Sequence, residues 1–158
     1  MRVSEVMTTN VQSCTPDTNL SAAAMQMWNG DFGSLPVLDR DRQVIGMITD
    51  RDICMAAATR HEDITNINVG DVTTGQVQSC AAEMSIQDAL KIFEQARVHR
   101  LPVVDKDQKL QGILSITDIV RHTVDAQDRR SSGVPHPEVV NTLKAICTPH
   151  ARASAAGV

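Results

Sequence analysis

Aromatic residues are almost missing from this 158-residue sequence, which has one Trp, two Phe and no Tyr. Proteins that bind single-stranded nucleic acid stack bases on aromatic side chains, so this composition disfavours that class. Basic runs are missing as well, because the longest is the pair Arg129 and Arg130. Fifteen Lys and Arg against 19 Asp and Glu leave a net charge of −4. We therefore expect no nucleic-acid partner.

Long apolar stretches and paired cysteines are absent too. No stretch approaches 18 uninterrupted apolar residues, and the first ten residues lack the apolar core of a signal peptide. These absences predict a cytoplasmic protein without a membrane partner. The four cysteines lie far apart and form no C-x-x-C, which indicates reduced thiols rather than a disulfide framework. With 42% hydrophobic and 22% charged residues, the chain has the composition of a soluble globular protein.

What the sequence does contain is an internal repeat. Shifted by 66 positions, Val3 to Cys54 aligns with Val69 to Val120 without a gap. Of the 52 aligned pairs, 16 are identical, where unrelated sequences would give about three. The segments "VQSC" and "LPV" both recur. The predicted division of the chain is repeat 1 (3–60), a linker (61–68), repeat 2 (69–128), a C-terminal helix (137–148) and a flexible tail (149–158).

Each repeat predicts the same order of elements, namely strand, helix, strand, strand, helix. "VQSC" is short and apolar, as in a strand. The helix after it has apolar side chains at the i, i+3, i+4, i+7 spacing of one buried face. These positions are Leu20, Ala23, Ala24 and Met27 in repeat 1 and Ile86, Ala89, Leu90 and Phe93 in repeat 2. Two apolar runs joined by an Asp-rich turn then predict paired strands. The last helix is expected to run to about Arg60 in repeat 1 and about Asp128 in repeat 2.

A motif at the start of that last helix occurs twice, as "GMITDRDI" and "GILSITDI". Thr49 with Asp52, and Ser115 with Asp118, have the S/T-x-x-D pattern of a capping box, which alone explains either copy. A helix start also offers free amide groups to a phosphate, and a carboxylate one turn in can accept hydrogen bonds from two ribose hydroxyls. Because the motif recurs after a glycine and an "LPV" strand in both repeats, the pattern favours a phosphorylated sugar as ligand.

The combination of repeat, "LPV" and this motif resembles the CBS domain, whose tandem pair is called a Bateman module. The resemblance covers Val3 to about Asp125. It implies an α/β (α+β) fold in which two β-α-β-β-α repeats pack about a pseudo-two-fold axis. It also implies a non-catalytic regulatory module that binds an adenine nucleotide (AMP, ADP, ATP or NAD) between the repeats. The segment "VVNTLKAICTPH" is similar to the last helix of small stand-alone bacterial two-repeat members.

The resemblance further implies a place in signal transduction, energy sensing or stress response. We expect no effector domain beside the repeats, so an unknown effector protein or assembly would carry the signal. Related modules pair into flat homodimers, and we expect a homodimer here.

By the same resemblance, Asp52 and Asp118 would hold ribose, with Thr49 and Ser115 near phosphate. The base would rest on aliphatic groups and on backbone. The positions concerned are Val11, Val77 and the backbone beside Leu35 and Leu101.

The two repeats differ in charge around the expected ligand. His99 and Arg100 precede the second "LPV" and resemble phosphate-contacting residues, whereas repeat 1 has Gly33 and Ser34 there. Arg51 lies inside the first motif, where repeat 2 has a threonine. If these cationic side chains point into the cleft, they add charge-assisted partners for phosphate. The difference predicts unequal affinities at the two sites.

Three other functions stay open. The first is an enzyme. The five His occur without H-E-x-x-H or a nucleophile motif, so neither catalytic residues nor a metal site are predicted. A redox or metal sensor would use Cys14 and Cys80, which occupy equivalent places in the two repeats. A structural or interaction protein with empty nucleotide clefts would have the same sequence features.

Overall fold

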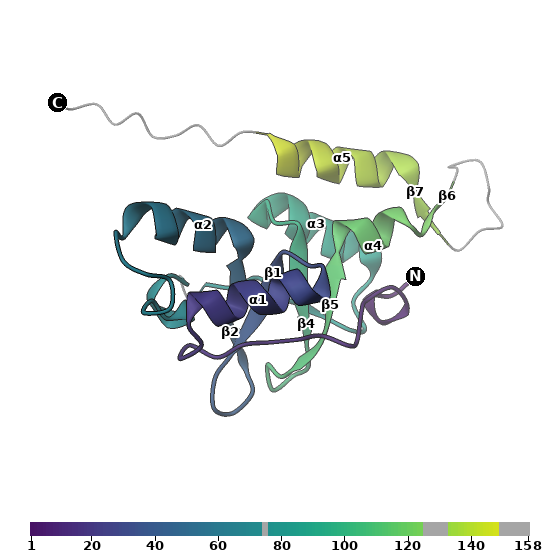
Figure 1. Ribbon diagram of the computed structural model, residues 1–158. Coiled ribbons are helices and arrows are strands. Elements are labelled where there is room, and N and C mark those ends of the chain that lie inside the picture. The colour runs from purple at the N-terminus through teal and green to yellow at the C-terminus, as the bar shows by residue number, and fades with distance from the viewer. Residues whose placement is uncertain (74–75, 125–132, 149–158) are drawn as a thin grey trace.

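The computed structural model describes residues 1–73, 76–124 and 133–148, and the predicted flexible tail 149–158 lies outside them. Helices and strands follow the repeat (Figure 1). In repeat 1 they are α1 (Leu20–Gly30), β1 (Ser34–Leu38), β2 (Val44–Thr49) and α2 (Asp50–Thr59). Their counterparts in repeat 2 are α3 (Ile86–Ala96), β4 (Arg100–Val104), β5 (Leu110–Ser115) and α4 (Ile116–Val120). The predicted mixed α/β fold is therefore confirmed.

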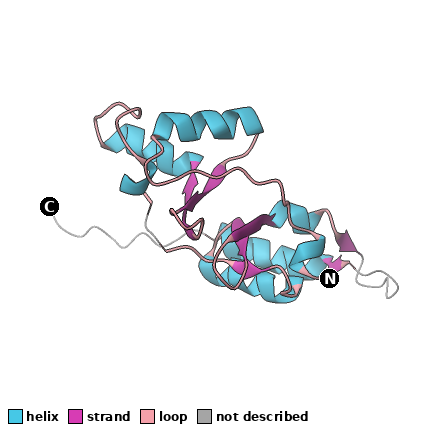
Figure 2. Cartoon of the chain, turned by 90° about the horizontal axis from the view of Figure 1, so that it is seen from below, coloured by secondary structure: helices cyan, strands magenta, loops and turns pink. Residues whose placement is uncertain are grey.

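The first helix of each repeat forms as its sequence predicts. Asn19 caps α1, because its side chain accepts a hydrogen bond from the Ala22 amide at 2.8 Å, and Ser85 caps α3 in the same way. The apolar faces of both helices are buried, down to Phe93 at 0% exposed, although Ala24 is only half-buried. Figure 2 shows the strands of both repeats between these outer helices.

The prediction that "VQSC" forms a strand is wrong for most of its length. Cys14 makes a single bridge to Val37, and in repeat 2 only β3 (Cys80–Ala81) pairs, in parallel with β4. The physical reason is that this segment crosses between the repeats. Thr8 pairs with Ile113 of repeat 2, so the residues between Thr8 and Cys14 span the gap and have no strand beside them.

The prediction that the last helix of repeat 2 reaches about Asp128 is also wrong, because α4 ends at Val120. Side chains take the carbonyl groups that a longer helix would use: His122 Nδ1 lies 2.8 Å from the Asp118 carbonyl oxygen, and Thr123 Oγ1 donates to the Val120 carbonyl at 2.9 Å. The chain then enters β6 (Thr123–Val124), which pairs with β7 (Val134–Pro135).

The repeats exchange their first segments. The 3-10 helix η1 (Val3–Glu5) packs into the core of repeat 2, where Val3 is 0% exposed. Its counterpart η2 (Val69–Asp71) packs into the core of repeat 1, and the Val69 amide donates to the Thr18 carbonyl at 2.8 Å. Figure 1 shows the purple N-terminal segment beside repeat 2. Each core is thus completed by chain from the other repeat.

A further helix, α5 (His136–Cys147), lies where the sequence predicts one over 137–148. It packs on α3 and α4 (Figure 1), and Val139 and Ile146 join the core of repeat 2. Buried Thr142 donates a hydrogen bond from Oγ1 to Glu94 Oε1 at 2.6 Å. Within the described part of the chain, no helix is long and apolar enough to cross a membrane.

Candidate functional site

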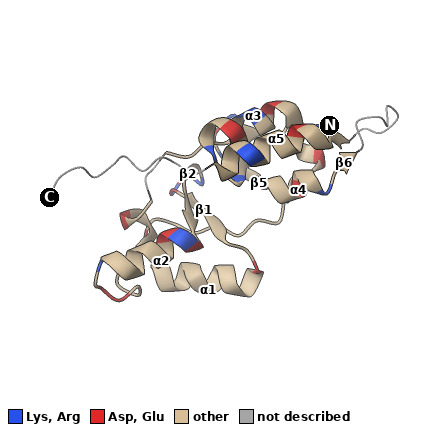
Figure 3. Ribbon diagram, turned by 90° about the horizontal axis from the view of Figure 1, so that it is seen from above, with Lys and Arg blue, Asp and Glu red and all other residues tan. Residues whose placement is uncertain are grey.

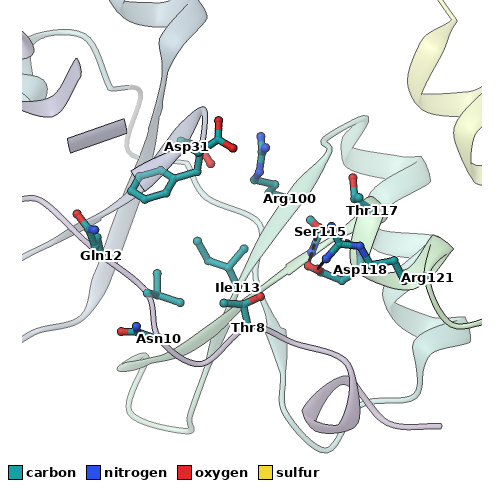
Figure 4. A pocket seen from close by; sticks show the side chains of 13 residues that line it. Thr8, Asn10, Gln12, Asp31, Arg100, Ile113, Ser115, Thr117, Asp118 and Arg121 are labelled. Carbon is teal, nitrogen blue, oxygen red and sulfur yellow. Dashed lines mark hydrogen bonds and ion pairs between the residues drawn. The ribbon is translucent and has the colours of Figure 1, made fainter. Parts of the chain in front are cut away.

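A cleft of about 350 Å³ lies between the two repeats, because the crossing segment of repeat 1 runs over strand β5 of repeat 2. Its size suits a small organic ligand, since such pockets range from about 300 to 1,000 Å³. The lining residues are Thr8, Asn10, Val11, Gln12, Asp31, Phe32 and Ser34 from repeat 1, and Arg100, Ile113, Ser115, Thr117, Asp118 and Arg121 from repeat 2 (Figure 4). We call it the central cleft.

A second cleft, of about 420 Å³, adjoins the central cleft. The two share Asp31, Phe32 and Arg100. Beyond this junction, the second cleft is lined by Ala24, Met27, Trp28, Gly33, Asp50 and Ile53, all from repeat 1. A ligand longer than the central cleft would therefore continue between α1 and the start of α2.

Ser115 and Asp118 form a complete capping box at the start of α4. The Ser115 amide donates to Asp118 Oδ2 at 2.9 Å, and the Asp118 amide donates to Ser115 Oγ at 3.1 Å. The Ser115 hydroxyl also donates to Oδ2. Oδ1 takes no part in the cap and lies 4.0 Å from Arg121 Nη1, and the Asp118 side chain keeps 16% of its surface exposed. This carboxylate can therefore cap the helix through one oxygen and accept ligand hydroxyl groups through the other.

Positive charge in the central cleft comes from two arginines. Arg100 stands opposite Ser115 in the β4–β5 ladder, and Arg121 lies one turn beyond Asp118 on the same side of the chain. Because α4 has only five residues, its dipole contributes little. A phosphate in this cleft would thus be held by the guanidinium groups rather than by the helix start.

Ser34 is the one buried lining side chain with an unsatisfied polar atom among the described residues. It is 4% exposed, and its Oγ has no hydrogen-bond partner there. A buried hydroxyl without a partner costs free energy, about 1–3 kcal/mol. A ligand or water in the cleft can supply the missing hydrogen bond.

Four of the predicted residues meet in the central cleft, namely Val11, Arg100, Ser115 and Asp118. Thr49 and Asp52 form the equivalent capping box at α2, where the Thr49 amide donates to Asp52 Oδ2 at 2.9 Å. That pair lines neither of the two clefts described above.

The remaining predicted residues lie elsewhere. Arg51 and His99 are exposed and line neither cleft. Leu35 and Leu101 are 0% exposed, so only their backbone could touch a ligand. Val77 packs on an apolar cluster between the repeats that contains Leu38, Val44 and Val104.

Sequence reasoning missed several lining residues, chiefly Asn10, Gln12, Asp31, Phe32 and Arg121. Arg121 had a signal, because it follows Asp118 by three positions and so lies beside it on a helix. The others had none, because their places in the cleft depend on how the two repeats pack together.

The two thiols of the redox alternative are poorly placed for it. Cys14 belongs to the core of repeat 1 and Cys80 to the core of repeat 2. Burial raises the pKa of each thiol to about 11. Because the thiolate is the reactive form, this shift lowers their reactivity. In the described ranges, no three His, Cys, Asp or Glu side chains gather as metal ligands.

Comparison with known proteins gives two family matches within the chain. A sequence model of the CBS domain matches residues 3–59 and 69–125. Hypoxic response protein 1 of Mycobacterium tuberculosis is 32% identical over 150 residues, which cover 95% of this chain and 96% of that protein. The resemblance predicted from the sequence is confirmed by both findings.

Two solved structures have folds similar to that of this chain. The crystal structure of hypoxic response protein I with two coordinated zinc ions is 31% identical, with a TM-score of 0.71, and covers 77% of this chain and 98% of that one. The structure of CBSX2, a CBS-pair protein of Arabidopsis thaliana, in complex with AMP is 27% identical, with a TM-score of 0.67. It covers 76% of this chain and 93% of that one.

Proposed function

Because this chain belongs to the CBS-domain family, we propose that it is a non-catalytic regulatory module that binds an adenine nucleotide in the central cleft. The observation that carries the proposal is the meeting of Asp118 Oδ1, two arginines and apolar side chains in one cleft between the repeats. The AMP complex of CBSX2 supports an adenine nucleotide as the ligand. AMP, ADP, ATP and NAD share the adenosine that these residues would hold.

Each part of the nucleotide has a partner in the central cleft. Val11 and Ile113 offer apolar surface to the base, which suits a chain so poor in aromatic residues. Asp118 Oδ1 accepts hydrogen bonds from ribose hydroxyls. Arg100 and Arg121 pair with phosphate, and the Ser34 hydroxyl gains the partner that it lacks.

A second nucleotide site around Thr49, Arg51 and Asp52 remains part of the proposal. The support is the repeat itself, because the two capping boxes have the same hydrogen bonds. Binding at the two sites would be unequal, since their surroundings differ in charge. The Asp52→Ala and Asp118→Ala variants should then lose separate binding events.

The signal would pass to a partner through the relative position of the repeats. A ligand can shift that position only by the difference between its affinities for the two arrangements. We propose a homodimer as the working form, an unidentified effector protein as the receiver and the cytoplasm as the location.

The decisive experiment is calorimetric titration of the full chain with AMP, ADP, ATP and NAD. We expect Asp118→Ala to weaken binding at the central cleft at least tenfold, because the variant removes the carboxylate that would hold the ribose. The matched control is Asp88→Ala. Asp88 belongs to a similar S-x-x-D cap at the start of α3, where it accepts from Ser85 Oγ at 2.7 Å, but it lines neither cleft.

Each variant keeps its N-cap serine but loses the hydrogen bond from that serine hydroxyl to the carboxylate, so each should lose about 1 kcal/mol of folding free energy. Only the Asp118 variant should lose ligand. Equal binding by wild type and Asp118→Ala would contradict the assignment of the cleft. Failure of all four nucleotides to bind the wild-type chain would refute nucleotide sensing and leave an interaction scaffold.

A further inference from the structure

The junction between the central cleft and the second cleft carries an acid where a phosphate chain would pass. Asp31 lines both clefts, together with Arg100 and Phe32. Figure 4 shows Arg100 between Asp31 on one side and Ser115, Asp118 and Arg121 on the other. Asp31 and Arg100 are not paired with each other within 4.0 Å. Both charged groups therefore face whatever occupies the junction.

The second cleft becomes less favourable to anions beyond that junction. Its charged lining residues are Asp31, Asp50 and the shared Arg100, and the rest of the lining is mostly apolar. A single phosphate held between Arg100 and Arg121 meets two cations. The second and third phosphates of a longer chain would approach two carboxylates and leave water for an apolar wall, both of which oppose binding.

The equivalent position of repeat 2 has the same backbone conformation with a basic residue. Asp31 ends α1 in the left-handed conformation with φ 53° and ψ 46°, and Arg97 ends α3 with φ 52° and ψ 44°. The backbone at this position accepts either charge. The fold thus accepts an acid here without requiring one.

We propose that Asp31 makes the central cleft selective for adenosyl ligands with no more than one phosphate. This inference rests on the proposed function, since it concerns the ligand of the same cleft. The carboxylate repels the added charge of a diphosphate or triphosphate, while Arg100, Arg121 and the Ser34 hydroxyl remain sufficient for one phosphate. Selection by charge at this point would let the protein respond to a monophosphate in the presence of excess triphosphate.

The test is the ratio of ATP to AMP dissociation constants, measured by calorimetry without divalent cations for wild type, Asp31→Asn and Asp31→Arg. Adenosine serves as the uncharged reference. We expect wild type to bind AMP at least tenfold more tightly than ATP, from charge repulsion over a few ångströms at the edge of a protein. Asp31→Asn should bring the ratio to about threefold or less, and Asp31→Arg should bring it below one. Adenosine affinity should stay within about twofold in all three.

The matched control is Glu62→Gln, which makes the same change in net charge on an exposed residue that lines neither cleft. Its ratio should equal that of wild type. Because each ratio is taken within one variant, a loss of stability cancels. The Asn variant also suits the left-handed backbone if the Arg variant folds poorly.

The outcomes separate the two proposals. Binding of AMP and ATP with equal affinity by wild type, or an unchanged ratio in both Asp31 variants, would overturn the role of Asp31 alone. Failure of every adenosyl compound to bind wild type would overturn this inference together with the proposed function.

Discussion

Cys14 and Cys80 are buried thiols whose pKa values burial raises from 9.0 to about 11. Below pH 9 the thiol is neutral in both the folded and the unfolded chain, so it makes no pH-dependent difference. Between pH 9 and 11 the unfolded chain releases the proton while the folded chain keeps it. Unfolding is therefore favoured as the pH rises through this window.

The expected result is a loss of stability between pH 9 and pH 11, on the order of 2–3 kcal/mol for each thiol. Urea unfolding of wild type, Cys14→Ala and Cys80→Ala at pH 8, 9, 10 and 10.5 measures it. Each variant should show a flatter pH dependence than wild type, whatever its stability at pH 8. Parallel curves for all three proteins would contradict the assignment to these thiols. The absence of Tyr removes another group that titrates near pH 10.

Single residues also mark the limit of sequence reasoning about the site. The S/T-x-x-D pattern caps three helices, at Thr49, Ser85 and Ser115. The sequence analysis predicts the caps at Thr49 and Ser115, because capping depends on four neighbouring residues, whereas the cap at Ser85 comes from the structure. It cannot show that the Ser115 copy alone lines the central cleft, since that depends on Arg100 and Arg121 lying beside it in the fold.

At the scale of helices and strands, the sequence predicts the features that depend on interactions between neighbouring residues. The buried faces of α1 and α3 and the paired strands β1–β2 and β4–β5 follow from apolar spacing and turn residues, and the structure confirms them. The "VQSC" strands fail because they depend on which repeat a segment meets, and the end of α4 fails because the chain leaves the helix for β6, which pairs with β7. Asn10 and Gln12, which line the cleft from the crossing segment, were missed because their places depend on how the two repeats meet.

Helix α5 offers a test at this scale. Thr142 is 0% exposed and donates to Glu94 Oε1, so Thr142→Val should leave a half-buried carboxylate without this donor. We expect a loss of about 1–3 kcal/mol in the free energy of unfolding. Urea denaturation measures it, with the exposed Thr148→Val as control, which should lose less than about 0.5 kcal/mol.

Nucleotide affinity should not change in Thr142→Val, because α5 lines neither cleft. A variant as stable as wild type would show that Thr142 does not fasten α5 to α3. Weaker nucleotide binding at full occupancy of the folded state would show that α5 reaches the site.

At the scale of the whole molecule, the helices α1 and α2 of repeat 1 differ from α3 and α4 of repeat 2 in what covers them. In repeat 2, α5 covers α3 and α4. In repeat 1, α1 has no charged residue along its length (Figure 3), and its outer surface and that of α2 expose large apolar side chains. These are Met25 at 53%, Trp28 at 82% and Met55 at 51% exposed. Trp and Met are enriched in interfaces, so this face suits a second copy of the chain.

The substitution Trp28→Glu tests that dimer. It introduces the residue that repeat 2 has at the equivalent position, where Glu94 contacts α5. Light scattering at micromolar concentration should give a dimeric mass for wild type and a monomeric mass for the variant. Ile45→Glu is the control, because Ile45 is exposed on β2 outside this helix pair, and it should stay dimeric. A monomeric wild type, or a dimeric Trp28 variant, would refute the proposed interface.

The exchanged segments η1 and η2 limit how far the two repeats can move relative to each other. Val3 and Val69 are each buried in the hydrophobic core of the opposite repeat. A wide hinge opening would therefore disrupt both cores at once. The two halves are therefore expected to unfold as one cooperative unit. Any ligand-driven change would then be limited to a slight rotation of the two repeats, and neither repeat should survive as an isolated fragment.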